Sequence, residues 1–563
     1  ARTAAAAGFD RIITFDMGGT STDVAHYAGE FERVFDTLVA GVRLRAPMLH
    51  IHTVAAGGGS ICRFDGTRLR VGPASAGANP GPACYRRGGP LTLTDCNLLL
   101  GRIQPDCFPQ VFGPDQRQPL DRNIVHQRFA TLAGEVAAAT GQHLTPMALA
   151  EGFLRIAVEN MANAIKHIST QRGYDVTTYT LCCFGGAGGQ HACAVADALG
   201  MPTILIHPLA GMLSAYGMGL AETRLLKERA LEMPLTADLI PALGAAWAEL
   251  EAAGSAAMMA QGLPPDRLRA QGNMRLRYAG SDTALSIPVP EWAKGATSPS
   301  WPWGGSPQAG RDPKRPGLAG LEPAAGEEAG LDSVGLDLEG LADRFAAAHR
   351  QRFGFVMTDK ALVVEAVTVE VIGEDFAAET KIGGWAGLAT LPSLGADSPA
   401  RANTSDAISL ANNLSKLPSI PSPNGSANPT RANPASASPN PASDDSSSGP
   451  QKSASANPTR ATLPLHLAGQ DHAVPLFQRG ALRAGEMIRG PAIVSEDGAT
   501  TLIEPGWQGE VRPGGELVLT RHEPRPARVA VGTAVDPILL EVFNNLFMAI
   551  AEQMGVTLAN TAH

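Results

Sequence analysis

The sequence predicts an α/β fold whose sheet is at least partly parallel. An apolar run at residues 12–15 predicts a buried strand, which a glycine turn joins to a second strand at residues 24–27. Further along, residues 179–206 predict a strand, a glycine-rich loop, a helix and another strand. Two strands joined through a helix in this way lie parallel in one sheet.

The turn between the first two strands has the residue types of a phosphate-binding loop. Its sequence is DMGGTSTD, at residues 16–23. The two glycines let backbone N–H groups approach an anion, the three hydroxyl residues add donors, and the carboxylates suit a hydrated Mg²⁺. A plain polar hairpin turn is the alternative. The chain contains no Gly-Lys pair, so it has no P-loop.

A second glycine cluster, Gly57 to Gly59, follows residues 53–56. Three consecutive glycines permit a close approach of the backbone to a ligand or to another strand. His50 and His52 lie just before this cluster, two positions apart on one strand face, and are a candidate metal pair. Histidines with a structural role are the more common alternative.

A long amphipathic helix is predicted from Thr145-Pro146 to a point near Gly173. Its apolar residues recur at helical spacing: Leu149, Phe153, Ile156, Met161, Ile165 and Ile168. The loop at residues 185–190 then opens another helix. His191 stands where a dinucleotide-binding GxGxxG motif needs its last glycine, which argues against a Rossmann site. The N–H groups of this loop still favour an anion or a nucleotide; helix capping by Gln190 and His191 is the alternative.

Composition divides the chain into segments. Residues 1–230 alternate strands and helices, and residues 231–393 continue this pattern around a low-complexity insertion at 293–333. Residues 394–462 consist largely of Ser, Asn, Pro and Ala, which predicts a disordered linker. Residues 463–525 are strand-rich, and residues 526–563 contain a helix that starts at Asp536-Pro537.

The apolar face of this last helix must pack against something. It consists of Leu539, Val542, Phe543, Leu546, Phe547, Ile550 and Met554. Because little chain follows it, and because the sequence starts without Met, we expect a fragment of a longer protein.

Charge and composition exclude several classes of function. A net charge of −9 argues against broad nucleic-acid binding. No apolar run approaches the ~18 residues of a membrane span, and no secretory signal is visible. The seven cysteines lack metal-site spacing, and Cys182 and Cys183 are expected to act as small hydrophobes in a buried strand. We therefore expect a reduced, cytoplasmic protein without membrane or nucleic-acid partners.

Several long motifs resemble the hydantoinase/oxoprolinase family. They are DMGGTSTDVA (16–25), HTVAAGGGSI (52–61), VGPASAGANPGPACYRRGGPLTLTDCNLLLGR (71–102) and CFGGAGGQHACAVADALGM (183–201). FPQVFGP (108–114) and the tail LEVFNNLFMAIAEQMGVTLANTAH (540–563) are similar to the eukaryotic-type 5-oxoprolinase branch of this family. The resemblance covers residues 1–230 and later parts more loosely.

The resemblance implies an ATPase core of the actin/hexokinase/Hsp70-like (ribonuclease H-like) type. In such folds ATP lies between two halves, each with a phosphate loop. The resemblance makes residues 16–23 the second phosphate loop and residues 185–189 the adenosine loop. The first phosphate loop is expected upstream of Ala1, and residues 526–563 are expected to open a B-type domain.

The implied activity is ATP-dependent hydrolysis of 5-oxo-L-proline to L-glutamate, a step of the glutathione cycle, through a phosphorylated lactam. The implied cofactors are ATP and Mg²⁺, with K⁺ also allowed, and the full-length enzyme is expected to be a dimer. The implied catalytic residues are Asp16 and Asp23, with Asp16 also on the metal. The implied cofactor-binding residues are Gly18, Gly19, Thr20, Thr22, Gly57, Gly58, Gly59, Gly185, Gly186, Gly188 and Gly189. A related hydantoinase, a ketone carboxylase or a nucleotide-binding fragment without turnover are the alternatives.

Overall fold

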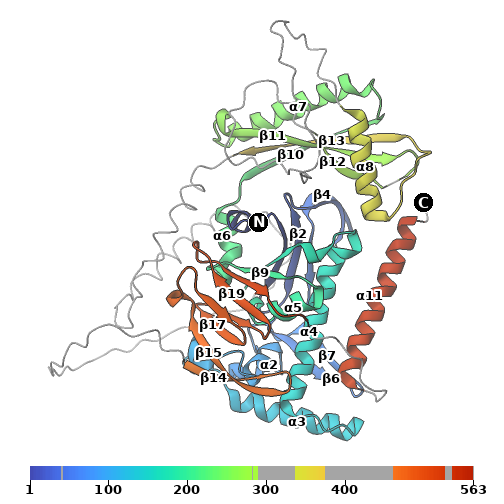
Figure 1. The fold of residues 1–563 in the computed structure, drawn as a ribbon. Helices are drawn as coiled ribbons and strands as arrows, with labels where there is room; N and C mark the ends of the chain where they lie inside the picture. The colour runs from blue at the N-terminus through green and yellow to red at the C-terminus, as the bar shows by residue number, and fades with distance from the viewer. Residues whose placement is uncertain (40–41, 282, 290–336, 374–460, 526–535, 562–563) are drawn as a thin grey trace, which may run out of the picture. The chain divides into compact units, whose positions relative to one another are not determined.

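The central element of the fold is an eight-stranded sheet. The computed structural model describes residues 1–39, 42–281, 283–289, 337–373, 461–525 and 536–561. The strand order of the sheet is β16-β19-β20-β9-β8-β1-β2-β5. Figure 1 labels β2, β9 and β19 of this sheet. The strands are β1 (Arg11–Met17), β2 (Thr22–Ala28), β5 (Ile51–Val54), β8 (Thr180–Phe184), β9 (Thr203–Ile206), β16 (Met487–Arg489), β19 (Trp507–Val511) and β20 (Leu517–Arg521).

The middle of this sheet is parallel, as the sequence predicts. Strand β8 pairs in parallel with β1 on one side and with β9 on the other. The remaining pairs of the sheet are antiparallel, including the β1–β2 hairpin. Since parallel strands share a direction, the carboxyl ends of β1, β8 and β9 meet at one edge of the sheet.

Helices cover this sheet and supply much of its core. The predicted long helix is α4 (Pro146–Ile168); the side chain of Thr145 caps it by accepting from the N–H of Ala148. All six apolar residues predicted for its buried face are buried, and they pack with the inner residues of β1 and β8 in one cluster. Helix α4 also contacts α2 (Leu93–Leu99), α3 (Arg122–Thr140) and α5 (Ala192–Leu199).

The strand-rich C-terminal segment completes the central sheet. Residues 517–520 of β20 pair with residues 203–206 of β9, so β16, β19 and β20 extend the sheet beyond β9. The other strands of the segment form a separate four-stranded sheet: β14 (Ala461–Leu467), β15 (Gln470–Gln478), β17 (Ala492–Glu496) and β18 (Ala499–Ile503). The predicted insertion at 293–333, and the predicted linker up to residue 460, lie outside the described residues.

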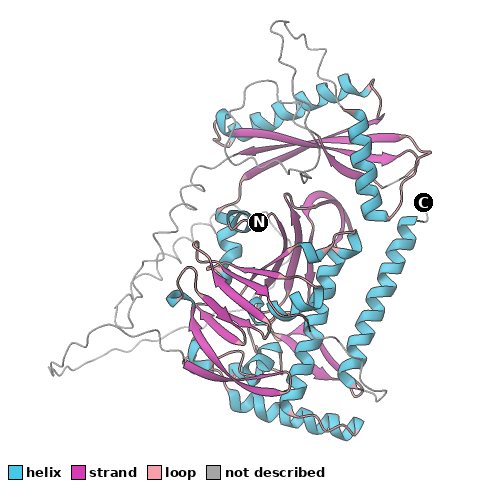
Figure 2. Cartoon of the chain, in the orientation of Figure 1, coloured by secondary structure: helices cyan, strands magenta, loops and turns pink. Residues whose placement is uncertain are grey.

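A third sheet has its own core. It contains β10 (Thr223–Pro234), β13 (Leu362–Gly373), β11 (Leu268–Tyr278) and β12 (Leu285–Pro288), in that order. Helices α7 (Leu239–Ala260) and α8 (Leu338–Phe353) pack on it and share its apolar cluster (Figure 2).

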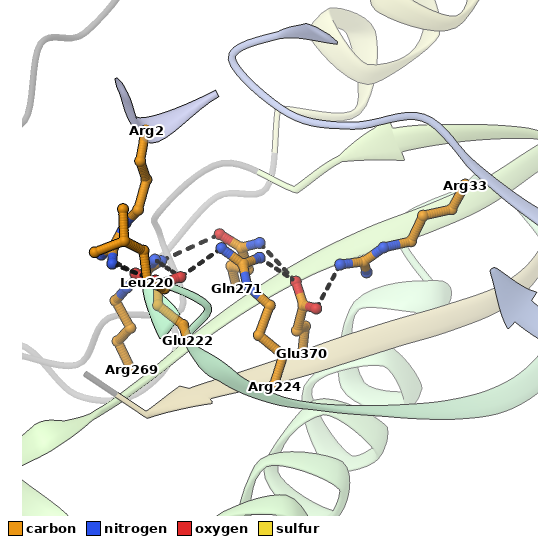
Figure 3. Close-up of polar contacts among 8 residues, drawn as sticks. All are labelled: Arg2, Arg33, Leu220, Glu222, Arg224, Arg269, Gln271 and Glu370. Atoms are coloured by element: carbon orange, nitrogen blue, oxygen red, sulfur yellow. Dashed lines mark hydrogen bonds and ion pairs between the residues drawn. The ribbon is translucent and has the colours of Figure 1, made fainter. Parts of the chain in front are cut away.

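Two glutamates at the third sheet form ion pairs with arginines from distant parts of the sequence (Figure 3). Glu370, of which only 6% of the side chain is exposed, accepts hydrogen bonds from Arg33, Arg224 and Gln271. Glu222 pairs with Arg2, Arg224 and Arg269. Arg2 precedes the core strand β1 and Arg33 begins β3 (Arg33–Val39), so these ion pairs join the third sheet to the N-terminal region.

The last helix, α11 (Pro537–Thr561), starts at the predicted cap, because the Asp536 carboxylate accepts from the N–H groups of residues 538 and 539. It packs on α4, and Val542 is buried there. The rest of its predicted apolar face is largely exposed; Phe547 and Met554 are 67% and 68% exposed.

The seven cysteines are all free thiols, and six of them are buried. Cys182 and Cys183 lie in the buried strand β8, as predicted. Within the described ranges, we find no helix with the length and apolar character that crossing a bilayer requires.

Candidate functional site

Three segments that follow parallel strands meet at the carboxyl edge of the central sheet. Asp16 lies at the end of β1, the glycine loop at 185–189 follows β8, and residues 207–214 follow β9. Ligands of open α/β sheets bind in the crevice outside this edge. The sequence-predicted phosphate hairpin and glycine loop therefore belong to one site in space.

The tip of the β1–β2 hairpin offers unpaired backbone donors. The N–H of Gly18 bonds to the carbonyl of Ser21 at 3.1 Å and closes the turn. Among the described residues, the N–H groups of Gly19 and Thr20 have no acceptor, and both residues are exposed. A Cβ atom placed on Gly18 or Gly19 would meet nothing within 4 Å. The tip can therefore receive an anion on its free N–H groups.

Asp16 is held at the base of this hairpin. The hydroxyl of Ser214, in α6 (Leu213–Gly219), donates to Oδ2 of Asp16 at 2.7 Å. Gly185 has a φ of +83°, and a Cβ there would lie 2.6 Å from Oδ1 of Asp16. Burial raises the pKa of Asp16, the bond from Ser214 lowers it, and the charge of Asp23 raises it. A cation near this carboxylate would offset its desolvation, and a hard ion such as Mg²⁺ prefers such oxygen ligands.

Asp23 and Thr22 brace the hairpin. Asp23 pairs with Thr53 on the neighbouring strand β5, and the Thr53 hydroxyl donates to its Oδ1. The hydroxyl of Thr22 is buried and donates to the carbonyl of Ala56 at 2.6 Å. These two hydrogen bonds connect β2 to Thr53 and Ala56 and thereby fix the position of the hairpin tip.

The glycines at 57–59 pack under the hairpin. The N–H groups of Gly58 and Gly59 donate to the carbonyls of Gly18 and Gly19 at 3.0 and 2.6 Å. The N–H of Gly57 donates to the Ser60 hydroxyl. A Cβ on Gly57 would lie 2.4 Å from the carbonyl carbon of Thr20, so only glycine fits. All three N–H groups are used inside the protein, and the cluster supports the tip of the β1–β2 hairpin.

The loop at 185–189 contains one glycine whose N–H has no described acceptor and two glycines that are packed tightly against the protein. The N–H of Gly186 has no acceptor among the described residues and lies beside the hairpin, because the next N–H, of Ala187, bonds to the carbonyl of Met17. A Cβ on Gly188 would meet the Cys183 sulfur at 2.9 Å, and one on Gly189 would meet the carbonyl oxygen of Thr500 at 2.6 Å. Gly188 and Gly189 are therefore required by packing, and Gly186 keeps a donor free.

Gln190 and His191, which follow this loop, are buried. Asn97 bonds to both side chains, and Arg102 donates to the Gln190 carbonyl. Burial, with Arg102 nearby, lowers the pKa of His191 to about 3, so this ring is neutral at physiological pH. These residues anchor the loop through Asn97 and Arg102, and neither side chain caps the helix α5, so the helix-capping alternative is wrong.

His50 and His52 do not share a site. The His50 ring lies 2.8 Å from a guanidinium nitrogen of Arg172, whereas the His52 ring packs on His167 at 4.5 Å between centroids. Burial and cationic neighbours lower the pKa of His50 to about 4. Across the described residues, no group of three or more His, Cys, Asp or Glu side chains is placed to hold a metal.

The segments at this edge of the sheet lie in a region that matches a known protein family. Residues 1–227, which contain all three glycine segments, match the hydantoinase/oxoprolinase family model. The motifs that carry the resemblance in the sequence are thus the ones that form the site.

Curated relatives in this family extend the similarity beyond residue 227. A protein named 5-oxoprolinase from Dictyostelium discoideum is 30% identical over 556 residues, which is 98% of this chain and 35% of that protein. The caprolactamase subunit alpha of Pseudomonas jessenii is 34% identical over 288 residues, 50% of this chain and 40% of that one. The chain therefore spans about a third of the length of the first relative.

A solved structure supports the fold. The ATP-dependent caprolactamase from Pseudomonas jessenii matches with a TM-score of 0.63 and 23% identity, over 92% of this chain and 60% of that one. At this identity the match establishes a shared mixed α/β fold.

Two parts of the site are missing from the sequence-based prediction. Ser214 follows the strand β9 by eight residues, in the stretch HPLAGMLS at 207–214. This stretch has neither the paired glycines nor the run of hydroxyl residues found at 16–23. The turn between β17 and β18, which touches the loop at 186, lies about 310 residues from that loop and about 475 residues from the hairpin, and no local signal connects them.

Proposed function

We propose that this chain carries the nucleotide-binding part of an enzyme that uses ATP to open the lactam 5-oxo-L-proline to L-glutamate. The observation that carries the proposal is the pair of N–H groups at Gly19 and Thr20, which have no acceptor in the described part of the chain, near the partly buried carboxylate of Asp16. We propose this lactam as the substrate because the similar proteins are named 5-oxoprolinase.

Opening a lactam with ATP requires a site that binds phosphate groups. A lactam is a poor electrophile. Phosphorylation of its amide oxygen by ATP releases ADP and activates the ring carbon, so that water can add to it. The C–N bond then breaks to give a free amine and an acyl phosphate, and a second water hydrolyses the acyl phosphate to the carboxylate and inorganic phosphate. Phosphoryl transfer depends on positioning and on stabilising charge. The N–H groups of Gly19, Thr20 and Gly186 would bind phosphate oxygens, and Asp16 would hold the metal or orient the attacking group. Mg²⁺, when bound, would neutralise charge on the phosphates.

We also propose that the central sheet is one half of an actin/hexokinase/Hsp70-like ATPase. The supporting observations are the hairpin at the end of β1, the glycine loop after β8 and their common edge. In this proposal residues 16–23 and 185–189 keep the roles of phosphate loop and adenosine loop, and Thr22, Asp23 and residues 57–59 position them.

The first test is nucleotide binding. We expect Mg·ADP to bind the 563-residue chain, and Asp16→Asn to weaken this binding tenfold or more while leaving the circular-dichroism spectrum unchanged. Asp471→Asn is the matched control, since that carboxylate is 84% exposed in a different sheet. Equal affinities for wild type and Asp16→Asn would remove Asp16 from the site.

The second test is turnover. Joined to the regions that its longer relatives also contain, the chain should release glutamate from 5-oxo-L-proline only when ATP is present. Nucleotide binding without release would leave a binding module and reject the enzyme.

A seven-membered lactam is the second candidate substrate, because the caprolactamase subunit alpha is 34% identical over 288 residues. Competition between ε-caprolactam and 5-oxo-L-proline in the same assay separates the two. Preferential release of 6-aminohexanoate would favour the larger ring.

A further inference from the structure

The turn between β17 and β18 brings the C-terminal segment to the candidate site. Glu496 ends β17 and pairs with Ala499 across the turn. The carbonyl oxygen of Gly498 lies only 2.8 Å from where a Cβ of Gly186 would stand, and 3.3 Å from that of Gly211. Since Gly186 follows β8 and Gly211 follows β9, the turn sits against both loops at the carboxyl edge of the central sheet.

The side chain of Glu496 faces the central sheet. Residues 492, 494 and 496 share one face of β17 because side chains alternate along a strand. Ala492 and Val494 pack in the main core cluster, together with Cys183 at the end of β8 and Ile206 at the end of β9. Glu496 continues this row at the end nearest the site.

The carboxylate of Glu496 lacks a partner. Its Oε2 is buried, and no hydrogen-bond partner for it exists among the described residues. A buried polar atom without a hydrogen bond lowers the stability of the fold by roughly 1–3 kcal/mol. We therefore expect a bound ligand to provide the hydrogen-bond partner of this atom.

Burial favours the neutral form of Glu496, although the charge of Arg479 opposes it. Burial raises its pKa to about 7; Arg479 lowers the pKa, and Asp497 in the same turn raises it again. Burial raises the pKa of the Cys183 thiol well above its usual value, and the charges of Asp16 and Glu496 both raise it further. Arg479 is itself held by the carbonyls of Ile206 and Gly515. An anion bound at the edge would shift Glu496 further toward the neutral form.

We propose that Glu496 contacts the phosphate of the bound nucleotide as a neutral carboxyl group that donates a hydrogen bond. This inference rests on the proposed nucleotide site. An ionised Glu496 would repel the phosphate, so binding must take up a proton whenever Glu496 is ionised in the free protein. The affinity for nucleotide then falls as the pH rises above 7, by up to about tenfold per pH unit.

Isothermal titration calorimetry with Mg·ADP tests this proposal. Measurements in HEPES and in Tris, buffers of different ionisation enthalpy, give the number of protons taken up between pH 7 and 8. We expect wild type to take up a fraction of a proton, and Glu496→Gln to bind with less than a threefold loss at pH 7 and with that uptake removed. Glu510→Gln is the control, since its side chain is 42% exposed on β19 and pairs with Arg512.

The outcomes separate the two proposals. Failure of wild type to bind Mg·ADP would reject the nucleotide site itself. Binding with no proton uptake, or with proton release as for a carboxylate that ligates the metal, would overturn the role of Glu496 alone, as would an uptake that survives in Glu496→Gln. If Glu496→Gln does not fold, Glu496→Asp replaces it: the shorter carboxyl group should reach the phosphate poorly and lower the uptake, and an unchanged uptake would again overturn the role.

Discussion

The glycine pair at 18–19 and the glycine triplet at 57–59 look alike in sequence but differ in what their backbones do. At the hairpin tip, a Cβ atom on either glycine would find open space, and no described residue accepts from the N–H groups of Gly19 and Thr20. In the triplet, every N–H is bonded inside the protein, and a Cβ on Gly57 would overlap the backbone of Thr20. The first cluster leaves room for a ligand, whereas the second lets two segments of backbone meet.

The largest expected effect is a loss of stability when a glycine of the triplet at 57–59 is replaced. Gly57→Ala places a methyl group against the backbone of residues 20 and 21, which cannot move aside as a flexible side chain could. We expect a loss of about 3 kcal/mol in the free energy of unfolding, measured by urea denaturation, because overpacking on rigid neighbours is costly. Gly134→Ala, at a helical glycine whose Cβ position is open, is the control. A loss below about 1 kcal/mol would show that the triplet is looser than the geometry indicates.

The loop at 185–189 falls between the two cases, and its anchor His191 is sensitive to acid. The ring has a folded pKa of about 3, against 6.5 when unfolded, so the unfolded state binds the proton first as the pH falls. Stability from this residue is complete above pH 6.5 and is lost on acidification toward pH 3. Wild type should therefore lose about 2 kcal/mol more than His191→Gln between pH 7.5 and pH 5. Parallel urea titrations at both pH values check this, and equal losses would contradict it.

A smaller effect tests the brace between the two glycine clusters. Thr22→Val removes the hydroxyl that donates to Ala56 and leaves that carbonyl without this partner. We expect about 1–2 kcal/mol of destabilisation by thermal or urea unfolding. Thr22→Ser keeps the hydroxyl and should recover part of the loss. If Val and Ser behave alike, the hydrogen bond does not hold the triplet to the hairpin.

The smallest effect on stability, and the sharpest test of the comparison, comes from Gly19→Ala. A methyl group there meets no protein atom, so the free energy of unfolding should change by less than about 0.5 kcal/mol. The methyl would, however, crowd a phosphate at the tip and weaken Mg·ADP binding about tenfold, or about 1.4 kcal/mol. Calorimetry measures the affinity. Unchanged affinity would mean that the tip does not face the ligand.

The sequence by itself determined the local elements of this protein. The strands β1, β2, β8 and β9, the helices α4 and α11, and the caps at Thr145 and Asp536 follow from hydrophobic period and capping residues, which act over a few neighbours. It also placed the glycine segments that later meet at one edge of the sheet.

Tertiary structure alone decided which glycines leave their N–H groups free, because that depends on the segment that packs against each one. It also brought Ser214 to Asp16, and it joined residues 517–520 to the strand at 203–206. These contacts join parts of the chain about 200 to 300 residues apart. No local pattern encodes them, since their stability comes from burial and pairing that exist only in the folded chain.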